Sequence, residues 1–383
     1  MNSKKLQVCF VSTIAWPLRV YIGSHIRKIA EGCQVTCIAD GVSELVTSEL
    51  NYIAKFRQVA ISRSIDLFAD LLAVFNLCCI FKFGHFDCVH SIMPKAGLLA
   101  MSASLAVGVP NRFHTFTGQV WATRTGLSRR FLMSIDWLIA FMATGVLTVS
   151  YSQRDFLIAN RIVKAEKIVV LSNGSVGGVD TRRFMPDSQT RARCRHELGI
   201  GSDDFIFLFV GRLNREKGIS DLLDAFRIIC VNHSIWHLLL VGPDEDNYDS
   251  YIDNLPAVLR KRICRIGFTT RPEQFMMMSD VICLPSYREG FGSVLIEAAA
   301  CGLPAIASRI YGISDAVIEE VTGIFHAAGN TKELALCMLR IAQDKSLRQR
   351  LASSARARAI ECFSEEILTE AFKNYYRNHG LLF

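Results

Sequence analysis

The sequence predicts an α/β protein with two doubly wound parallel sheets, and three observations carry this prediction. The chain has 383 residues, 50% of them hydrophobic and 21% charged, so it can bury two cores of ordinary domain size. Short apolar runs of strand length alternate with longer stretches of helical length in both halves, as in βα units. A polar, glycine-rich stretch at 172–180 separates the two series. We therefore expect two Rossmann-like domains, residues 1–172 and 173–365, facing a cleft that the carboxyl ends of their strands line.

The first series occupies residues 6–160. Its expected strands are Leu6–Ser12, Gln34–Ile38, Cys88–Ser91, Arg112–Thr115 and Gly145–Ser150. Its expected helices are Ser24–Glu31, Ile65–Lys82, Ala96–Val107, Leu127–Met142 and Gln153–Asn160. The longest apolar runs, Leu71–Phe81 and Trp137–Val149, fall well short of the ~20 residues of a membrane span, so we expect most of each to be buried helix or strand.

The second series follows the glycine-rich stretch. Its expected strands are Phe205–Val210, His237–Val241, Arg262–Gly267, Val281–Pro285 and Ala305–Ser308. A helix is expected from about Ile219, and an Ala-rich helix from about Gly292, closed by Gly302 and Pro304.

The charge of the chain is uneven. Its formal net charge is +7, and residues 1–150 contain 14 Lys and Arg but only 8 Asp and Glu. No nucleic-acid-binding motif accompanies these cations, so we expect attraction to an anionic membrane or to a pyrophosphate-linked substrate instead. Arg124, Arg129 and Arg130 precede several large apolar residues in one expected helix, which suits a helix on a bilayer surface. The thirteen cysteines lack metal-ligand spacing, which favours free thiols in a reducing cytoplasm.

The stretch Ser286–Pro304 carries the strongest functional signal. It reads as strand, glycine turn and helix, so the free N–H groups of Gly292 and Ser293 and the positive end of the helix dipole can bind an anion. Glu289 lies in the turn and Glu297 lies eight residues further on. Both carboxylates can therefore reach one ligand.

A second set of candidate residues follows the strand Phe205–Val210. Gly211 ends this strand, and the loop after it contains Arg212 and Lys217, two cations that can hold a diphosphate. Taken alone, they could equally be a solvated surface pair. Asp244–Asp246 has the spacing of a metal–nucleotide motif, but we expect it to be a solvated loop.

At these residues the chain resembles the retaining family-4 glycosyltransferases of the GT-B fold. Glu289 and Glu297, followed by Cys-Gly-Leu-Pro, form the E-x7-E pattern of that family, and Gly211–Gly218 matches its phosphate-binding loop. The stretches 86–97 and 114–121 resemble the branch that builds bacterial capsule and O-antigen.

The resemblance implies a hexosyltransferase with a nucleoside-diphosphate sugar as donor. By family frequency this is a UDP-N-acetylhexosamine or a related UDP-sugar. The implied acceptor is a sugar on undecaprenyl diphosphate, which places the protein in the cytoplasm, peripherally on the anionic surface of the inner membrane. No metal or other cofactor is implied. Residues 366–383 are expected to form a helix that packs back on the first domain.

Each site residue takes a role from the resemblance. Glu297 would bind the ribose hydroxyls and Glu289 the sugar hydroxyls. His114 would position the sugar or stabilise positive charge at its anomeric carbon, although a lone histidine is more often a packed core residue. The diphosphate would be held by Gly211, Arg212, Lys217, Phe291, Gly292 and Ser293. Two alternatives stay open: a GT-B epimerase or phosphorylase, and a non-catalytic subunit of a glycan assembly complex.

Overall fold

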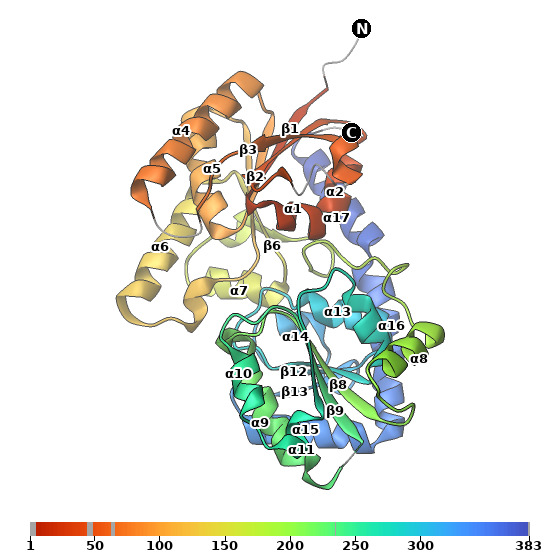
Figure 1. Cartoon of the computed structure of the whole chain (residues 1–383). Helices are drawn as coiled ribbons and strands as arrows, with labels where there is room; N and C mark the ends of the chain where they lie inside the picture. Colours follow the sequence, from red (N-terminus) through yellow and green to blue (C-terminus); the bar gives the residue numbers. More distant parts are fainter. Residues whose placement is uncertain (1–4, 44–48, 63–65, 234, 382–383) are drawn as a thin grey trace. The chain divides into compact units, whose positions relative to one another are not determined.

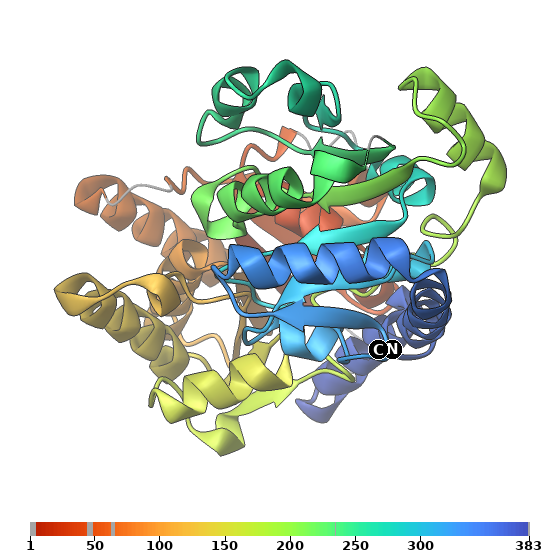
Figure 2. The same ribbon diagram turned by 90° about the horizontal axis from the view of Figure 1, so that it is seen from below.

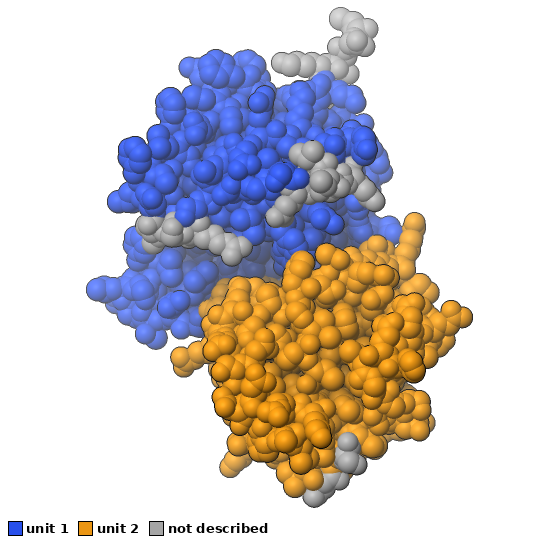
Figure 3. All heavy atoms as spheres, in the orientation of Figure 1, with its two compact units in different colours: residues 1–178, 365–383 blue, residues 179–364 orange. Residues whose placement is uncertain are grey.

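The computed structural model describes residues 5–43, 49–62, 66–233 and 235–381. The chain forms two compact units, which Figure 3 colours separately. Unit 1 comprises Met1–Gly178 and Glu365–Phe383, and unit 2 comprises Val179–Ser364. Each unit is built on one parallel sheet with helices on both faces (Figure 1), so the predicted pair of Rossmann-like folds is confirmed.

Unit 1 contains a seven-stranded sheet in the order β3-β2-β1-β4-β5-β6-β7. Its strand pairs are parallel. The direction of winding reverses between β1 and β4, and doubly wound sheets bind ligands at the carboxyl ends of strands beside such a switch point. The strands are β1 (Gln7–Ile14), β2 (Gln34–Asp40), β3 (Ala54–Gln58), β4 (Cys88–Ile92), β5 (Asn111–Phe116), β6 (Gly145–Thr148) and β7 (Ile168–Val170).

Two apolar clusters hold the helices of unit 1 against opposite faces of this sheet. One face is covered by α1 (Ala15–Val20), α2 (Gly23–Ala30) and α17 (Glu365–Asn378). The other is covered by α4 (Leu67–Gly84), α5 (Pro94–Ala106), α6 (Gly126–Met142) and α7 (Tyr151–Ala159). Short 3-10 turns are η1 (Glu49–Tyr52), η2 (Val120–Thr123) and η3 (Ala165–Lys167).

Helix α17 comes from the far end of the chain and packs beside α2. The ring of Phe372 stacks on that of His25 at a centroid distance of 4.4 Å, and the hydroxyl of Tyr376 lies 2.7 Å from Nδ1 of His90. Residues 382 and 383, which we expected to continue this segment, lie outside the described residues.

Helix α4 differs from the sequence prediction. We expected Leu71–Phe81 to be mostly buried, but in α4 only Ala73, Leu77 and Phe81 are buried, and a second side of the helix is exposed. The prediction was wrong because α4 is apolar on every side, so its sequence does not show which side faces the core. Ile65, where we expected this helix to begin, lies outside the described residues.

Unit 2 contains a six-stranded parallel sheet in the order β10-β9-β8-β11-β12-β13. Its strands are β8 (Phe205–Val210), β9 (Trp236–Val241), β10 (Ile263–Ile266), β11 (Val281–Leu284), β12 (Ala305–Ser308) and β13 (Gly323–His326). Figure 2 shows α9 and α15 side by side on one face of this sheet. The helices are α8 (Ser188–Glu197), α9 (Ile219–Ile229), α10 (Tyr248–Asp253), α11 (Ala257–Arg260), α12 (Pro272–Met278), α13 (Ser293–Ala300), α14 (Ile313–Ala316), α15 (Thr331–Gln343) and α16 (Lys345–Phe363), with η4 (Arg215–Lys217) and η5 (Cys230–Asn232).

The sequence prediction did not include β3, β7 and β13. Strand β3 reads Ala-Lys-Phe-Arg-Gln and lies at an edge of its sheet, so it lacks the apolar run by which the other strands were recognised. Strand β7 has only three residues, and β13 reads Gly-Ile-Phe-His, with two apolar residues among its four, so neither gives an apolar run of strand length.

Candidate active site

The carboxyl end of β11 carries the first cluster of candidate residues. Glu289 lies in the turn between β11 and α13, where its Oε1 accepts a hydrogen bond from Oγ of Ser286 at 2.9 Å. The same carboxylate forms an ion pair with the ammonium group of Lys217. Both charged side chains are largely buried, at 13% and 19% exposure. Glu289 and Lys217, predicted from separate motifs, are thus in direct contact.

Two glycines allow the loops around Glu289 to approach one another. Gly218 has φ +70°, and a Cβ there would lie 2.1 Å from the carbonyl oxygen of Pro285. Gly312 has φ +85°, and a Cβ there would lie 2.6 Å from the carbonyl oxygen of Gly290. Only glycine meets both requirements, namely a left-handed backbone and no side chain. The loop with Lys217 therefore lies directly against the end of β11.

The amino terminus of α13 follows this turn. Gly292 is its N-cap residue, with φ +75°, and no side chain caps the helix. The N–H group of Leu295 donates to the carbonyl oxygen of Gly292 at 2.8 Å, so the N–H groups before it, including that of Ser293, are the ones available to an anion. Phe291 is buried, and its ring contacts that of Phe363 at 5.3 Å, which fixes the entry to the helix.

Arg212 is paired with an acidic side chain of the loop that follows β9. One guanidinium nitrogen donates to both carboxylate oxygens of Glu245, at 3.1 and 3.0 Å, and Nδ2 of Asn214 donates to the same group at 2.8 Å. The preceding Gly211 bonds through its N–H to the carbonyl oxygen of Val241 at 2.9 Å. Both ionic side chains of this pair are well exposed, so solvent can exchange with it.

The acidic loop Asp244–Asp246 is therefore more ordered than the solvated loop we predicted. Asp246 accepts a hydrogen bond from the N–H of Arg215 at 2.7 Å, and Asp244 accepts from that of Asp249 at 2.8 Å. The loop is exposed, as predicted, but it holds the Arg212 loop through specific contacts. Within the described residues, no group of three or more His, Cys, Asp or Glu side chains is placed to hold a metal ion.

Glu297 lies half-buried in α13, just over one turn after the helix begins at Ser293. Burial raises the pKa of its carboxyl group to about 7, while nearby Arg183 lowers it and nearby Glu273 raises it. Arg183 forms an ion pair with Glu273 at 2.7 Å. Sequence reasoning missed both of these neighbours because they are 90 residues apart and belong to no local motif.

His114 is in unit 1, whereas the other predicted site residues are in unit 2. It lies fully buried in β5, and its Nδ1 is 2.8 Å from Oγ of Ser91. Burial lowers the pKa of the ring to about 3, so it is neutral at physiological pH. Gly97 makes room for the ring, since a Cβ there would lie 2.4 Å from its Cε1 atom.

Three buried polar atoms lie near the carboxyl edge of the unit 1 sheet without a hydrogen-bond partner among the described residues. They are Nε2 of His114, Oγ1 of Thr13 and Nε2 of Gln119. Buried polar groups are nearly always paired, so unpaired ones mark a place where water or a ligand binds. His114 and Gln119 lie in the stretch 114–121 that the sequence singled out, whereas no sequence motif pointed to Thr13.

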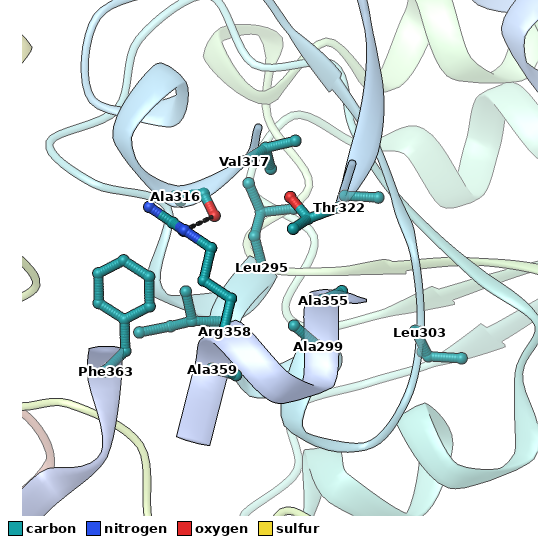
Figure 4. A pocket seen from close by; sticks show the side chains of 12 residues that line it. Leu295, Ala299, Leu303, Ala316, Val317, Thr322, Ala355, Arg358, Ala359 and Phe363 are labelled. Carbon is teal, nitrogen blue, oxygen red and sulfur yellow. Dashed lines mark hydrogen bonds between the residues drawn. The ribbon is translucent and has the colours of Figure 1, made fainter. Parts of the chain in front are cut away.

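Two hollows in unit 2 lie away from these residues. One, of about 10 Å³, lies behind α13 (Figure 4), where Arg358 donates to the carbonyl oxygens of Ala316 and Asp315 at 2.9 and 2.8 Å. It is too small for more than about one water molecule. The other, of about 350 Å³, lies at the amino ends of β11 and β12, opposite Glu289, and its Arg191 is paired with Asp280. Neither is a candidate for the donor site.

Comparison with known proteins gives a consistent result for both halves of the chain. Residues 190–358 match the family described as glycosyl transferases group 1, and residues 27–174 match the glycosyl transferase 4-like domain. The chain is 30% identical over 325 residues to the capsular polysaccharide biosynthesis glycosyltransferase CapM of Staphylococcus aureus, covering 83% of each chain.

Two further proteins are similar. The UDP-Gal:alpha-D-GlcNAc-diphosphoundecaprenol alpha-1,3-galactosyltransferase of Escherichia coli is 27% identical over 320 residues, which are 82% of this chain and 81% of that protein. The structure of Anabaena HepE in complex with UDP and glucose aligns with a TM-score of 0.80 and 19% identity, over 97% of this chain and all of the other. This structural likeness shows that the fold is shared.

Proposed function

Because the chain belongs to the group 1 glycosyl transferases and has the GT-B fold, we propose that it transfers a sugar, with retention of anomeric configuration, from a UDP-sugar to a lipid-linked acceptor. Glycosyl transfer itself follows from the family. The donor, the acceptor and the stereochemistry are our proposal. One observation carries the donor site: Glu289 is held by Lys217 and Ser286 beside the uncapped amino terminus of α13.

In this proposal the leaving diphosphate lies against α13. The N–H groups of Phe291, Gly292 and Ser293 and the ammonium group of Lys217 face the charge that builds on the departing phosphate. Arg212 joins them when it exchanges Glu245 for phosphate oxygens. These groups stabilise the transition state more than the bound donor, because the negative charge grows as the glycosidic bond breaks.

The two glutamates bind different parts of the donor. Glu289, held by its contact with Lys217, accepts hydrogen bonds from hydroxyls of the transferred sugar. Glu297 accepts from the ribose hydroxyls. His114 is neutral, so it acts as a hydrogen-bonding group that positions the sugar, and no proton needs to leave it. A phosphate oxygen of the leaving group takes the proton of the acceptor hydroxyl, on the face from which the donor departs.

The acceptor is proposed to be a sugar on undecaprenyl diphosphate, as in the name of the E. coli relative, and a UDP-N-acetylhexosamine or a related UDP-sugar to be the donor. The excess of cations in residues 1–150 supports an acceptor with a diphosphate and a protein on the cytoplasmic face of an anionic membrane. No metal ion is required, since Lys217, Arg212 and the N–H groups supply the positive charge.

The test is a transfer assay with purified protein, UDP-sugars and a sugar diphosphate on a short, soluble polyprenyl chain. We expect a product whose new linkage has the anomeric configuration of the donor, measured by NMR. Glu289→Ala should lower turnover about 100-fold or more. The matched control is Glu320→Ala, since Glu320 is also paired with a cation, in this case Arg340, but lies before β13 at the amino edge of the sheet. Near-normal turnover of Glu289→Ala would overturn the assignment.

Ligand binding separates the alternatives. UDP should raise the unfolding temperature more than GDP or ADP does, and Glu297→Ala should lose most of this shift. A donor that is converted without acceptor would indicate an epimerase or a phosphorylase. A protein that no nucleotide stabilises would be a non-catalytic subunit.

A further inference from the structure

Helix α4 exposes an apolar side that no described part of unit 1 covers. Its buried side, with Ala73, Leu77 and Phe81, packs on the core. On the exposed side Leu71 is 69% exposed and Phe75 is 65% exposed. The large apolar side chains exposed along this helix, which we call the α4 stripe, are Leu67, Phe68, Leu71, Leu72, Phe75 and Phe83.

A helix that is apolar on all sides is normally buried on all sides. Helix α4 is also long and apolar enough, by length and composition, to cross a bilayer. Its mean hydropathy is 1.8, and only 17% of its residues are buried. It does not need to cross one, because its inner side belongs to the apolar core on one face of the unit 1 sheet. An apolar stripe of this length on a folded domain marks an interaction surface.

Helix α6 extends this surface. Its exposed apolar residues include Leu127, Phe131 and Phe141, at 82%, 54% and 65% exposure. Trp137 is 49% exposed, and its ring stacks on that of Phe141 at 5.5 Å. Exposed tryptophan beside other large apolar side chains is typical of proteins that enter the interfacial region of a bilayer.

The two helices lie on the same side of unit 1. Both pack against α5 and belong to the same apolar cluster. Figures 1 and 2 show α4 and α6 along one outer side of this unit in both views. Their exposed residues therefore form one surface, which a single flat partner can cover.

The exposed charges of this surface are cationic apart from Asp66, whose carboxylate caps α4 by accepting hydrogen bonds from the N–H groups of Phe68 and Ala69 at 3.1 Å. Lys82, Arg124 and Arg130 are exposed, and none of them is paired with a carboxylate of the described residues. The acidic residues of the two helices are already engaged: Asp70 with Lys95 at 2.5 Å, and Asp136, buried, with Nε1 of Trp121 at 2.7 Å. A second copy of the chain, docked by the same surface, would bring like charges together. Anionic lipid headgroups complement them.

We propose that the α4 stripe and the exposed residues of α6 form the surface by which the protein docks on an anionic phospholipid bilayer. The apolar side chains enter the boundary between headgroups and acyl chains, and the three cations contact phosphate groups. This names the membrane surface of the proposed function and rests on it for its biological purpose. The binding itself does not require sugar transfer.

Vesicle flotation tests the proposal on the full chain. We expect the protein to float with vesicles of phosphatidylglycerol and phosphatidylethanolamine, and to float less with phosphatidylcholine or in high salt. The double variant Leu71→Gln/Phe75→Gln should bind the anionic vesicles about tenfold more weakly or worse. Both positions are exposed, so the fold should be retained, as measured by circular dichroism.

The matched control removes exposed apolar area from unit 2. Val258 and Leu336 are 69% and 66% exposed, and Val258→Gln/Leu336→Gln should float like the wild type. The charge variant Arg124→Gln/Arg130→Gln should bind anionic vesicles more weakly and lose most of the preference for them over phosphatidylcholine.

Other outcomes would overturn the proposal. Wild-type protein that does not float, or an α4 double variant that floats as well as the wild type, would refute it. A wild-type dimer in sedimentation that the α4 variant abolishes, without vesicle binding, would show that a second copy covers the stripe. Transfer to the soluble acceptor keeps the two questions apart: a protein that floats but transfers no sugar refutes the proposed function alone.

Discussion

Replacing Glu297 with glutamine is expected to stabilise unit 2 at alkaline pH while it removes a donor contact. Burial raises the pKa of this carboxyl group from its ordinary 4.5 to about 7, with Arg183 lowering it and Glu273 raising it. A pKa difference of this size corresponds to at most ~3 kcal/mol of unfolding free energy, and less where water reaches the half-buried carboxylate.

The sign follows from the two protonation states. Below pH 4.5 the carboxyl group is protonated in the folded and the unfolded chain, so it does not change stability. Between pH 4.5 and 7 the unfolded chain releases the proton first, so stability falls as the pH rises. Above pH 7 the full cost of the buried charge is present. Glutamine cannot ionise. The unfolding free energy of Glu297→Gln should therefore exceed that of the wild type by up to ~3 kcal/mol at pH 8.5 and match it near pH 4.5.

Urea unfolding at the two pH values measures the effect, followed by circular dichroism and by the fluorescence of Trp236 in β9 of unit 2. The control is Glu320→Gln, because the hydrogen bond from Arg340 lowers the pKa of Glu320, and its ionised form is therefore stabilising. The control should lose stability at pH 8.5. The reasoning would be refuted if Glu297→Gln were no more stable than the wild type at pH 8.5, or if its gain in unfolding free energy were the same at both pH values.

Three further predictions follow from the loops around β8 and β11. Glu245→Gln should raise the affinity for UDP, by at most about fivefold because the Arg212 pair is exposed. The control Glu320→Gln should leave this affinity unchanged, and calorimetry measures both variants. An unchanged affinity in Glu245→Gln would show that the pair does not compete with the diphosphate. Gly218→Ala should destabilise unit 2 by more than the ~1–2 kcal/mol expected from its left-handed backbone alone, because the new Cβ would lie 2.1 Å from a carbonyl oxygen. The control Gly199→Ala has φ +65° and open space, so equal losses in denaturant unfolding would contradict the predicted clash. EDTA should leave the transfer rate unchanged, and a loss that Mg²⁺ or Mn²⁺ restores would show that a metal ion holds the diphosphate.

The sequence predicted those parts of the donor site that are local in the chain. Ser286, Glu289 and Gly292 lie within a few residues of one another, so one strand–turn–helix pattern places them together. The contact between Lys217 and Glu289 joins two such patterns, because β8 and β11 are neighbours in the sheet and their carboxyl ends meet at one edge. Parallel topology therefore converts two local motifs into one site.

Contacts between residues that belong to no motif could not be predicted in this way. The partner of Arg212 is 33 residues away, in a loop whose acidic residues suggested only solvation. The ion pair between Arg183 and Glu273, beside Glu297, has no local signal either. The exposure of α4 escaped prediction for another reason: burial on one side of a uniformly apolar helix depends on its packing against α5, which the composition does not encode.

The two ion pairs of the proposed donor site differ in a way that bears on how a diphosphate would enter. The pair of Lys217 and Glu289 is largely buried and is supported by Ser286, so breaking it would leave a buried charge without a partner. The pair of Arg212 and Glu245 is exposed, and each partner can return to water at little cost. A diphosphate should therefore displace Glu245 and leave Glu289 in place. Lys217 then contacts phosphate with its remaining N–H groups while it keeps its contact with Glu289, and Arg212 is the cation that moves.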